Sequence, residues 1–454
     1  MNFPQPFENR IRSQFGDESQ AFLAALTESS PVSFRVNNYK YTDSINLPQV
    51  KWESKGYYLE NRPIFTLDPL IHAGVYYVQE AGSMFVGEVV RQTIGNRSVV
   101  ALDLCASPGG KTTHLLSTLS DDSLLVTNEV IKTRAVVLKE NVQKWGCPNV
   151  VVTNNDPKQI GELTHFFDLI LVDVPCSGEG MFRKDEKSIS EWSEDNVVLC
   201  AERQRRILAD VWESLKPGGF LVYSTCTYNE EENEKNVDWI KQNLGAERVE
   251  IKVEDDWNIT VTPQGYHFYP YKTKGEGFFL SVLRKNEGDI CTVKLSQNKK
   301  KQESFDTSKI KNWIIDNDNY NIQVNNNIVY AFAKQYQNHL LRLLDKLHII
   351  NSGLIIGELK GKDIIPDQAL ALSVILNKKA FPTIDLSWKD AILYLKKENI
   401  FKEGYPKGWL LAIYNNIPLG FLKNIGNRFN NNYPSEWRIK MAIDTETQQT
   451  MILR

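Results

Sequence analysis

Short apolar runs alternate with amphipathic stretches through the middle of the chain. Between residues 98 and 285, turn residues bound these runs, a pattern typical of buried strands separated by helices. The longest predicted helix, Asn196–Leu215, ends in a Lys-Pro-Gly-Gly turn. This alternation predicts an α/β fold, a doubly wound parallel sheet with helices on both faces. The predicted strands are Val99–Leu104, Leu124–Thr127, Val150–Thr153, Leu169–Asp173, Phe220–Ser224 and Phe278–Leu283.

The region before this sheet has a mixed pattern. Helical apolar spacing covers Ile11–Leu26, and a strand is predicted over Pro31–Asn37. We therefore expect a small α+β region at 1–95, followed by the sheet domain at 96–285.

The region after the sheet divides at a polar, lysine-rich stretch. Residues 286–307 contain few apolar side chains, which is typical of a linker. Beyond it we expect a C-terminal α+β region, with one domain at 308–380 and a β-rich module at 381–454. Short strands bounded by Asn, Gly and Pro are predicted in that module at Trp409–Tyr414 and Pro418–Leu422.

Composition narrows the class of protein. The chain has 454 residues, a length that suits more than one domain, and a net charge of -3, which does not by itself indicate a nucleic-acid-binding protein. Its six cysteines lack close pairing, as in reduced cytoplasmic proteins. No long apolar run or signal core is present, so we expect a cytoplasmic protein without a membrane segment. The six histidines lack metal-ligand spacing, and we expect no metal.

A turn rich in small residues follows the first strand of the predicted sheet. Small residues let the backbone approach a ligand, and the start of the next helix favours a carboxylate. A phosphate-binding P-loop is the rival interpretation, but its first glycine would have to stand where Cys105 does. A plain tight turn is the other alternative. The candidate cofactor-binding residues of this turn are Cys105, Ala106, Ser107, Pro108, Gly109, Gly110 and Lys111.

Acidic residues follow the next two strands. Glu129 could accept both hydroxyls of a ribose, and Asp156 could bond an adenine amino group. Either residue alone is as readily explained as a solvated loop residue or a helix cap. Their succession at consecutive strand ends favours a nucleoside ligand.

Two cysteines follow the fourth and fifth strands. Cys176 comes shortly after Asp173, and Cys226 lies 50 residues further on. Because consecutive strands of such a sheet are usually neighbours, both cysteines should face one pocket beside the cofactor. A single cysteine is more often a small buried residue, but two at strand ends, one near an acid, favour covalent chemistry.

A thiolate can activate a pyrimidine for methylation. Addition to C6 of cytosine makes C5 nucleophilic, an acid such as Asp173 supplies or holds a proton at N3, and a base then removes the C5 proton. The target base must leave its stack, which costs least in unpaired RNA.

The segments around these residues resemble the Sun (Nol/Nop/Sun) family of RNA 5-methylcytosine methyltransferases, over about residues 30–285. The resemblance implies a Rossmann-like class I methyltransferase fold with S-adenosyl-L-methionine as cofactor. It implies that Cys226 attacks C6 and that Cys176 helps to resolve the adduct. Implied cofactor contacts fall on 105–111, Glu129, Asp156 and Asp173. The Thr-Cys motif separates this family from DNA cytosine methyltransferases.

Further segments are similar to the bacterial RsmF branch of that family, which methylates small-subunit ribosomal RNA. They are Tyr77–Ala81, Gly180–Lys184 and Gly277–Phe279, although Gly82 stands where the branch usually has serine. The tail resembles that branch's C-terminal region with its PUA-like RNA-binding module. Ribosomal RNA is therefore the expected partner, with tRNA or a non-catalytic assembly role as alternatives. Near the Pro-Cys loop, we expect Arg183 and Lys184 to contact RNA phosphates.

Overall fold

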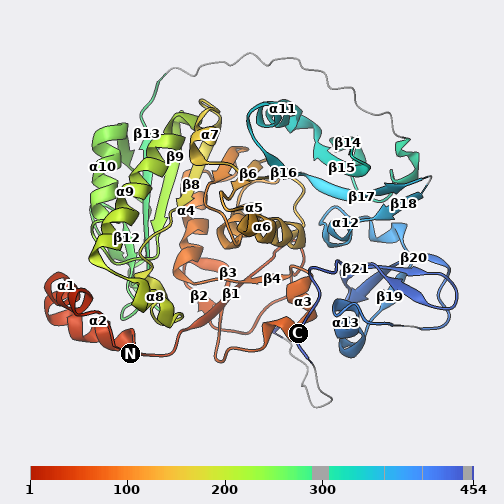
Figure 1. The fold of residues 1–454 in the computed structure, drawn as a ribbon, viewed down its shortest axis with the longest axis horizontal. Helices are drawn as coiled ribbons and strands as arrows, with labels where there is room; N and C mark the ends of the chain where they lie inside the picture. The colour runs from red at the N-terminus through yellow and green to blue at the C-terminus, as the bar shows by residue number, and fades with distance from the viewer. Residues whose placement is uncertain (1, 289–305, 362, 401, 443–451, 454) are drawn as a thin grey trace.

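A ten-stranded sheet forms the centre of the structure (Figure 1). The computed structural model describes residues 2–288, 306–361, 363–400, 402–442 and 452–453. The strand order is β11-β12-β13-β9-β8-β5-β6-β7-β16, and β10 pairs with β13. These strands are β5 (Val100–Asp103), β6 (Leu124–Asn128), β7 (Val150–Thr153), β8 (Phe167–Asp173), β9 (Leu215–Thr225), β10 (Ala246–Arg248), β11 (Thr260–Val261), β12 (Tyr266–Phe268), β13 (Phe278–Lys285) and β16 (Ile349–Ser352).

The strands predicted in the middle of the chain are present as β5 to β9 and β13. Strands β5 to β9 pair in parallel, but β13 is antiparallel to β9, so the sheet is mixed and not wholly parallel as predicted. Strand β9 begins at Leu215 and contains the segment predicted as a turn. Gly218 supplies the positive φ of 72° that lets the strand bend there.

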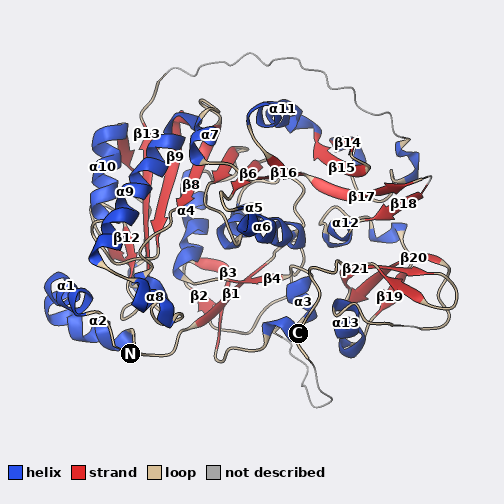
Figure 2. Ribbon diagram, viewed as in Figure 1, coloured by secondary structure: helices blue, strands red, loops and turns tan. Residues whose placement is uncertain are grey.

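Helices cover both faces of the sheet (Figure 2). Along β5, Ala101 packs into the core on one face, and Val100 and Leu102 pack into the core on the other. This alternation follows from the two-residue period of a strand buried on both sides. The first core includes α4 (Phe85–Thr93), α5 (Gly110–Thr118) and α6 (Lys132–Trp145), and the second includes α7 (Pro157–Gly161), α9 (Glu194–Val211) and α10 (Glu234–Leu244).

The N-terminal region combines two helices with a small antiparallel sheet. The helix predicted over residues 11–26 is divided into α1 and α2, because Gly16 adopts a φ of 51° between them. The strand predicted over residues 31–37 is β1. The elements of this region are α1 (Gln5–Phe15), α2 (Ser19–Ala25), α3 (Pro69–His72), β1 (Val32–Val36), β2 (Gln49–Val50), β3 (Glu53–Leu59) and β4 (Tyr76–Val78), with the small sheet ordered β2-β3-β1-β4.

A buried arginine fastens this small sheet to the central one. Arg35 of β1 is 1% exposed and donates to Gln79 Oε1 at 2.9 Å and to Thr113 Oγ1 of α5 at 2.7 Å. Its guanidinium also lies 4.6 Å from the ring centre of Trp145 in α6. The N-terminal region is therefore held against α5 and α6 at one end of the central sheet.

The C-terminal region contains two four-stranded sheets. The strands predicted at 409–414 and 418–422 are confirmed as β20 and β21. Of the predicted linker at 286–307, residues 289–305 lie outside the described part of the chain. The elements are β14 (Tyr320–Asn325), β15 (Ile328–Ala333), β17 (Leu354–Lys360), β18 (Asp363–Pro366), β19 (Thr383–Asp385), β20 (Gly408–Tyr414), β21 (Ile417–Asn424), β22 (Phe429–Asn431), α11 (Gln337–Lys346), α12 (Gln368–Leu372) and α13 (Trp388–Leu395).

One strand from beyond the linker joins the central sheet. Strand β16 pairs antiparallel with β7 and so covers what would otherwise be an exposed sheet edge (Figure 1). Leu340 and Leu343 of α11 are buried in the same core as Val151 of β7. Nothing in the sequence pattern indicated this pairing, because β16 is a short strand between a helix and a turn.

Helix α11 provides a matched test of this shared core. Leu343 is fully buried, whereas the adjacent Leu344 is 57% exposed. We expect Leu343→Ala to lower the free energy of unfolding by about 2–5 kcal/mol, and Leu344→Ala to change it by less than about 0.5 kcal/mol. Denaturant unfolding of the full chain measures both values. Equal effects of the two substitutions would show that α11 does not pack on the sheet as described.

Candidate active site and cofactor cavity

The carboxyl ends of β8 and β9 bring the two cysteines together. These strands pair in parallel, and Asp173 lies opposite Ser224. The chain therefore leaves both strands at the same edge, and Cys176 Sγ lies 3.1 Å from Cys226 Sγ. The backbone N–H of Cys226 also donates to Cys176 Sγ at 3.4 Å. Both side chains are half-buried, so they face a confined and accessible space.

The protonation of Cys176 follows from these contacts. Its hydrogen bond with Cys226, its burial and the nearby carboxylate of Glu232 all raise the pKa of Cys176 well above the ordinary value. Cys176 is therefore a neutral thiol at physiological pH as long as Cys226 is not bonded to a substrate.

Asp173 is held by two donors beside this pair. Its Oδ1 accepts from Ser224 Oγ at 2.7 Å, and its Oδ2 lies 2.8 Å from Lys111 Nζ. Burial disfavours the charged ammonium of Lys111, but the Asp173 carboxylate outweighs that effect and raises the pKa of Lys111. The pair connects the start of α5 with the end of β8, and it leaves lone pairs of the carboxylate available to a ligand.

A cavity of about 160 Å³ opens at the same edge of the sheet. Gly109 adopts a φ of 114°, which a side chain would strain, and α5 begins at Gly110 without a side-chain cap. The unpaired backbone N–H groups there suit a carboxylate. The cavity is lined by Tyr77, Val78, Gln79, Glu80, Ser83, Asp103, Cys105, Ala106, Ser107, Pro108, Gly110, Lys111 and Asp173.

Asp103 is a buried carboxyl in the lining of this cavity. It is fully buried at the end of β5, and Thr112 Oγ1 donates to its Oδ2 at 2.6 Å. Its Oδ1 has no hydrogen-bond partner among the described residues. Burial raises the pKa of Asp103 to about 7. A buried carboxyl with a free oxygen is suited to an ammonium group of a ligand.

The two acids predicted at the following strand ends have other partners in the structure. Glu129 is buried, accepts from the backbone N–H of Ile131 at 2.9 Å and lies 3.5 Å from Arg134. Asp156 is exposed and caps α7, accepting from the N–H of Lys158 at 3.0 Å. Neither lines the cavity, so their assignment to ribose and adenine stays a prediction.

The structure corrects the expectation for Arg183. Its side chain is only 4% exposed, and its guanidinium bonds Glu276 at 2.8 Å and the carbonyl of Ala25 at 3.2 Å. These contacts attach the N-terminal helices to the active-site loop and leave no free edge for a phosphate. Lys184 is 31% exposed, and its Nζ lies 3.7 Å from Glu276 Oε1.

Several residues of the site were not assigned from the sequence. Asp103 stands at the carboxyl end of the first strand, a position that could have identified it. Tyr77 and Gln79 come from the N-terminal region, and no spacing in the sequence places them against α5. Arg35 sets their position through its bond to Gln79.

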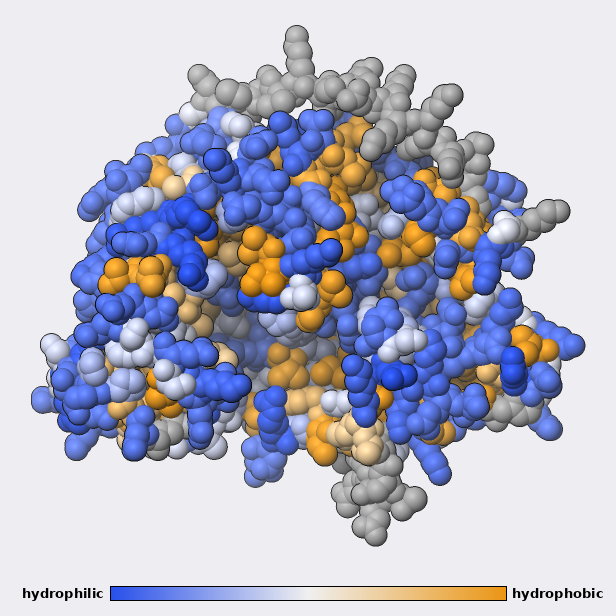
Figure 3. All heavy atoms as spheres, viewed as in Figure 1, coloured by the Kyte–Doolittle hydropathy of each residue, from blue (hydrophilic) through white to orange (hydrophobic). Residues whose placement is uncertain are grey.

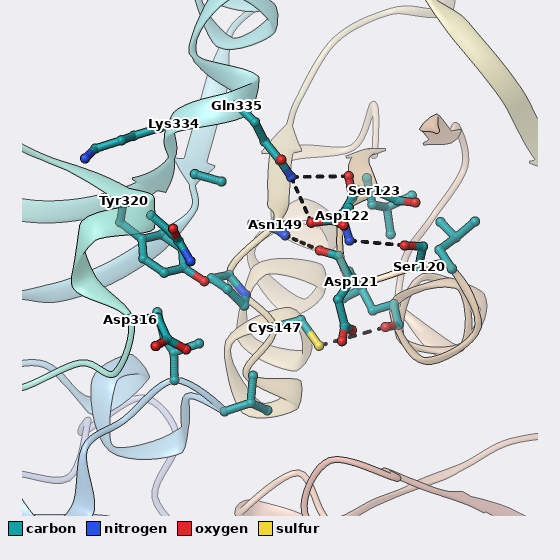
Figure 4. Close-up of a pocket in the computed structure, with 18 of the residues that line it drawn as sticks. Ser120, Asp121, Asp122, Ser123, Cys147, Asn149, Asp316, Tyr320, Lys334 and Gln335 are labelled. Carbon is teal, nitrogen blue, oxygen red and sulfur yellow. Dashed lines mark hydrogen bonds between the residues drawn. The ribbon is translucent and has the colours of Figure 1, made fainter. Parts of the chain in front are cut away.

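Another, larger cavity lies between the central sheet and the C-terminal region (Figure 4). It measures about 620 Å³, and its wall includes Asp121 and Asp122 before β6, at the opposite end of the strands from the cysteines. Gln335 from the C-terminal region bonds Asp122, and Asn149 bonds the carbonyl of Asp121 (Figure 4). Asp316 adds a further negative charge, so this wall disfavours phosphate groups.

Polar side chains cover most of the face seen in Figure 3, and apolar ones gather near its centre. The exposed apolar residues include a group at the start of α6, namely Val130, Ile131, Val136 and Val137.

No group of three or more His, Cys, Asp or Glu side chains in the described ranges is placed to hold a metal ion. None of the described helices has the length and apolar character needed to span a bilayer.

Fold and site together define a Rossmann-like methyltransferase. Comparison with family models gives a match to "16S rRNA methyltransferase RsmB/F" over residues 95–284. The "N-terminal domain of 16S rRNA methyltransferase RsmF" matches residues 3–81, and the "Methyltransferase RsmF PUA domain" matches residues 381–439. The chain is therefore similar to the RsmB/F methyltransferases over three segments that together cover most of its length.

Relatives match over nearly the whole chain. Ribosomal RNA small subunit methyltransferase F of Shigella boydii serotype 4 is 28% identical over 475 aligned residues, covering 96% of each chain, and that of Escherichia coli K12 has the same identity and coverage. A solved methyltransferase homolog protein from Pyrococcus horikoshii has 28% identity and a TM-score of 0.54, covering 63% of this chain and 96% of its own. NSun6 from the same organism, solved with SFG, shares the fold at 21% identity and a TM-score of 0.54, covering 63% of this chain and 99% of its own.

Fold and family imply S-adenosylmethionine as the cofactor. The residues present suit it: the open start of α5 fits the carboxylate of its methionine part, and the free oxygen of Asp103 fits the ammonium group.

The pKa of Asp103 gives a pH dependence for cofactor binding. Because Asp103 loses its proton near pH 7, its carboxylate form increases as the pH rises toward that value. We expect the affinity for S-adenosylmethionine to rise about tenfold between about pH 5.5 and about pH 7. Calorimetric titration measures this, and Asp103→Asn should remove most of the dependence. An unchanged slope in that variant would contradict the assignment.

Proposed function

We propose that this protein transfers a methyl group from S-adenosylmethionine to C5 of a cytosine in RNA, through a covalent adduct between Cys226 and C6. The observation that carries the proposal is the placement of Cys226 Sγ 3.1 Å from Cys176 Sγ, at the ends of two neighbouring parallel strands, β8 and β9. Asp173 lines the cofactor cavity and directly precedes the Cys176 loop. A methyltransferase acting on oxygen or nitrogen has no need of two adjacent thiols.

The reaction follows from the roles that these groups can take. The Cys226 thiolate adds to C6, a bond forms between sulfur and carbon, and the electron pair of the C5–C6 bond becomes available at C5. Asp173 stabilises the protonated N3 by accepting a hydrogen bond from it. When bound, S-adenosylmethionine supplies an electrophilic methyl group. Removal of the C5 proton then restores the C5–C6 double bond and expels Cys226 as thiolate.

Cys176 is placed to assist that last step. It contacts the sulfur that leaves, and as a neutral thiol it can donate a hydrogen bond to Cys226 Sγ as negative charge returns there. The stabilised thiolate is the better leaving group. This assignment gives the two cysteines different roles, attack for Cys226 and release for Cys176.

The remaining site residues are proposed by family resemblance and position. Residues 105–111, with Asp173, would hold the methionine part of the cofactor, and Glu129 and Asp156 would contact its nucleoside part after local rearrangement. Lys184 would meet RNA phosphates near the target base.

Small-subunit ribosomal RNA is the proposed substrate. The proteins named as ribosomal RNA small subunit methyltransferase F match 96% of this chain, including the region that matches the PUA domain. A match that includes the N-terminal and C-terminal regions supports a shared RNA substrate as well as shared chemistry, because such regions are the ones that select the RNA.

The two cysteines provide a prediction that separates their roles. Cys226→Ala should abolish methyl transfer, because it removes the thiolate that attacks C6 in the proposed reaction. Cys176→Ala should accumulate a protein–RNA adduct on denaturing gels, because release of Cys226 is slowed. An adduct that forms in Cys226→Ala but never in Cys176→Ala would reverse the assignment.

The substrate is tested in cells. Bisulfite sequencing of total RNA, with and without this protein, should show one or more cytosines of small-subunit ribosomal RNA that lose methylation on deletion. Loss confined to tRNA would correct the substrate and keep the chemistry. If no cytosine changes, the protein acts without turnover, for instance as an RNA-binding assembly factor.

A further inference from the structure

A buried carboxyl lies behind the two cysteine loops. Glu232 follows β9 in the segment before α10 and is fully buried. Its Oε2 accepts from the backbone N–H of Ser177 at 2.9 Å and from Gln204 Nε2 of α9 at 2.8 Å. The hydroxyl of Ser177 donates to its Oε1. Three donors, two from Ser177 and one from Gln204, therefore converge on this one side chain.

These donors connect Glu232 to both cysteine loops. Gln204 Nε2 also donates to the carbonyl of Pro175 at 3.0 Å, so the residues on either side of Cys176 are both fixed. The Ser177 hydroxyl lies 3.1 Å from Thr227 Oγ1, in the residue directly after Cys226. Glu232 is the common partner through which the Cys176 loop and the Cys226 loop keep their separation.

Glu232 has no cation to offset its burial. Among the ion pairs of the described residues, none includes Glu232, and burial raises the pKa of its carboxyl to about 7. The carboxylate of Glu179 adds to that rise, and Glu232 in turn raises the pKa of Cys176. A buried acid without a cationic partner costs stability, which an apolar residue at this position would avoid.

We propose that Glu232 is a positioning residue, which sets the distance between Cys176 Sγ and Cys226 Sγ by holding Ser177 against Thr227. The proposal rests on the proposed function, in which Cys176 must reach the sulfur of Cys226 as it leaves. The carboxyl does not touch the reacting atoms itself, and it acts through the backbone of the Cys176 loop.

The substitution Glu232→Gln keeps the shape of the side chain and removes its charge. The amide oxygen can take the place of Oε2 and accept from Ser177 N–H and Gln204, while the amide NH₂ donates to the Ser177 hydroxyl, which then donates to Thr227. Glu232→Ala removes every one of these bonds. Glu231→Gln is the matched control, because Glu231 is a half-buried neighbour, with 42% of its side chain exposed, whose carboxylate pairs only with Lys235 in the described structure.

Disulfide trapping measures the distance between the two thiols without any RNA. Diamide takes up two electrons and two protons from a pair of thiols, forming one S–S bond, and peptide mass mapping quantifies the Cys176–Cys226 product over time. We expect wild type, Glu231→Gln and Glu232→Gln to react within about twofold of one another, and Glu232→Ala to react at least about tenfold more slowly, because misplacement of ~1 Å costs up to about 100-fold in rate. A wild-type rate in Glu232→Ala overturns the proposal.

Steady-state methylation adds a second readout. If Glu232 positions the thiols, Glu232→Ala lowers kcat and leaves KM for RNA within about twofold, and Glu232→Gln restores most of kcat. A variant that loses kcat and KM together, without recovery in Glu232→Gln, assigns Glu232 to general structure and overturns the proposal. If no variant, wild type included, methylates RNA, the proposed function fails, and the trapping rates still decide the role of Glu232.

Ser177→Ala serves if Glu232→Ala does not fold. It removes only the hydroxyl that joins Glu232 to Thr227 and keeps the backbone N–H. Trapping should then slow by about threefold or more, since one of the two links to the Cys176 loop is lost. A rate equal to wild type in this variant overturns the proposal as well.

Discussion

The parallel pairing of β8 with β9 is the constraint on which the site depends. Asp173 lies opposite Ser224, so the two chains leave the sheet at the same edge, and their cysteines meet at 3.1 Å. Both strands are buried on both faces, which fixes their register strongly, because a slip would turn apolar side chains away from their cores. The position of the thiols is thus set by the hydrophobic core of the sheet, and polar contacts such as those of Asp173 with Lys111 and Ser224 adjust the groups around them.

The regions before and after the central sheet support the site in different ways. The N-terminal region supplies Tyr77 and Gln79 to the cofactor cavity, and Arg35 holds this region in place. Among the described residues, no hydrogen bond joins the C-terminal region to the two cysteines, but β16 covers the open edge of the sheet at β7. An unpaired edge there would favour association between chains, so this region protects the catalytic domain as well as carrying the module that matches the PUA domain.

Much of the central sheet and of the candidate site could be predicted from the sequence, because these features depend on residues that lie close together in the chain. Apolar runs located β5 to β9 and β13 of the central sheet but not the short strands β10, β11, β12 and β16. The residues directly after β8 and β9 were recognisable because strand ends in such folds carry function. Contacts between distant segments were not predictable in the same way. The pairing of β16 with β7 and the burial of Arg183 against Glu276 depend on tertiary packing. Glu232 was missed because its role is visible only once Ser177 and Gln204 are seen to converge on it. Asp156 illustrates a limit of another kind, since a helix cap and a nucleoside ligand have the same sequence signal.

The central claim is that Cys226, and not Cys176, forms a bond to the target cytosine. RNA that carries 5-fluorocytosine tests it most directly, because fluorine at C5 cannot be removed as a proton and the covalent adduct cannot resolve. Incubation of the full-length protein with such RNA and S-adenosylmethionine, followed by protease digestion and mass mapping, identifies the attached residue. We expect a denaturant-resistant complex with the nucleotide on the peptide that contains Cys226. Attachment at Cys176, or a failure to form any complex with RNA that is methylated in its unfluorinated form, would contradict it.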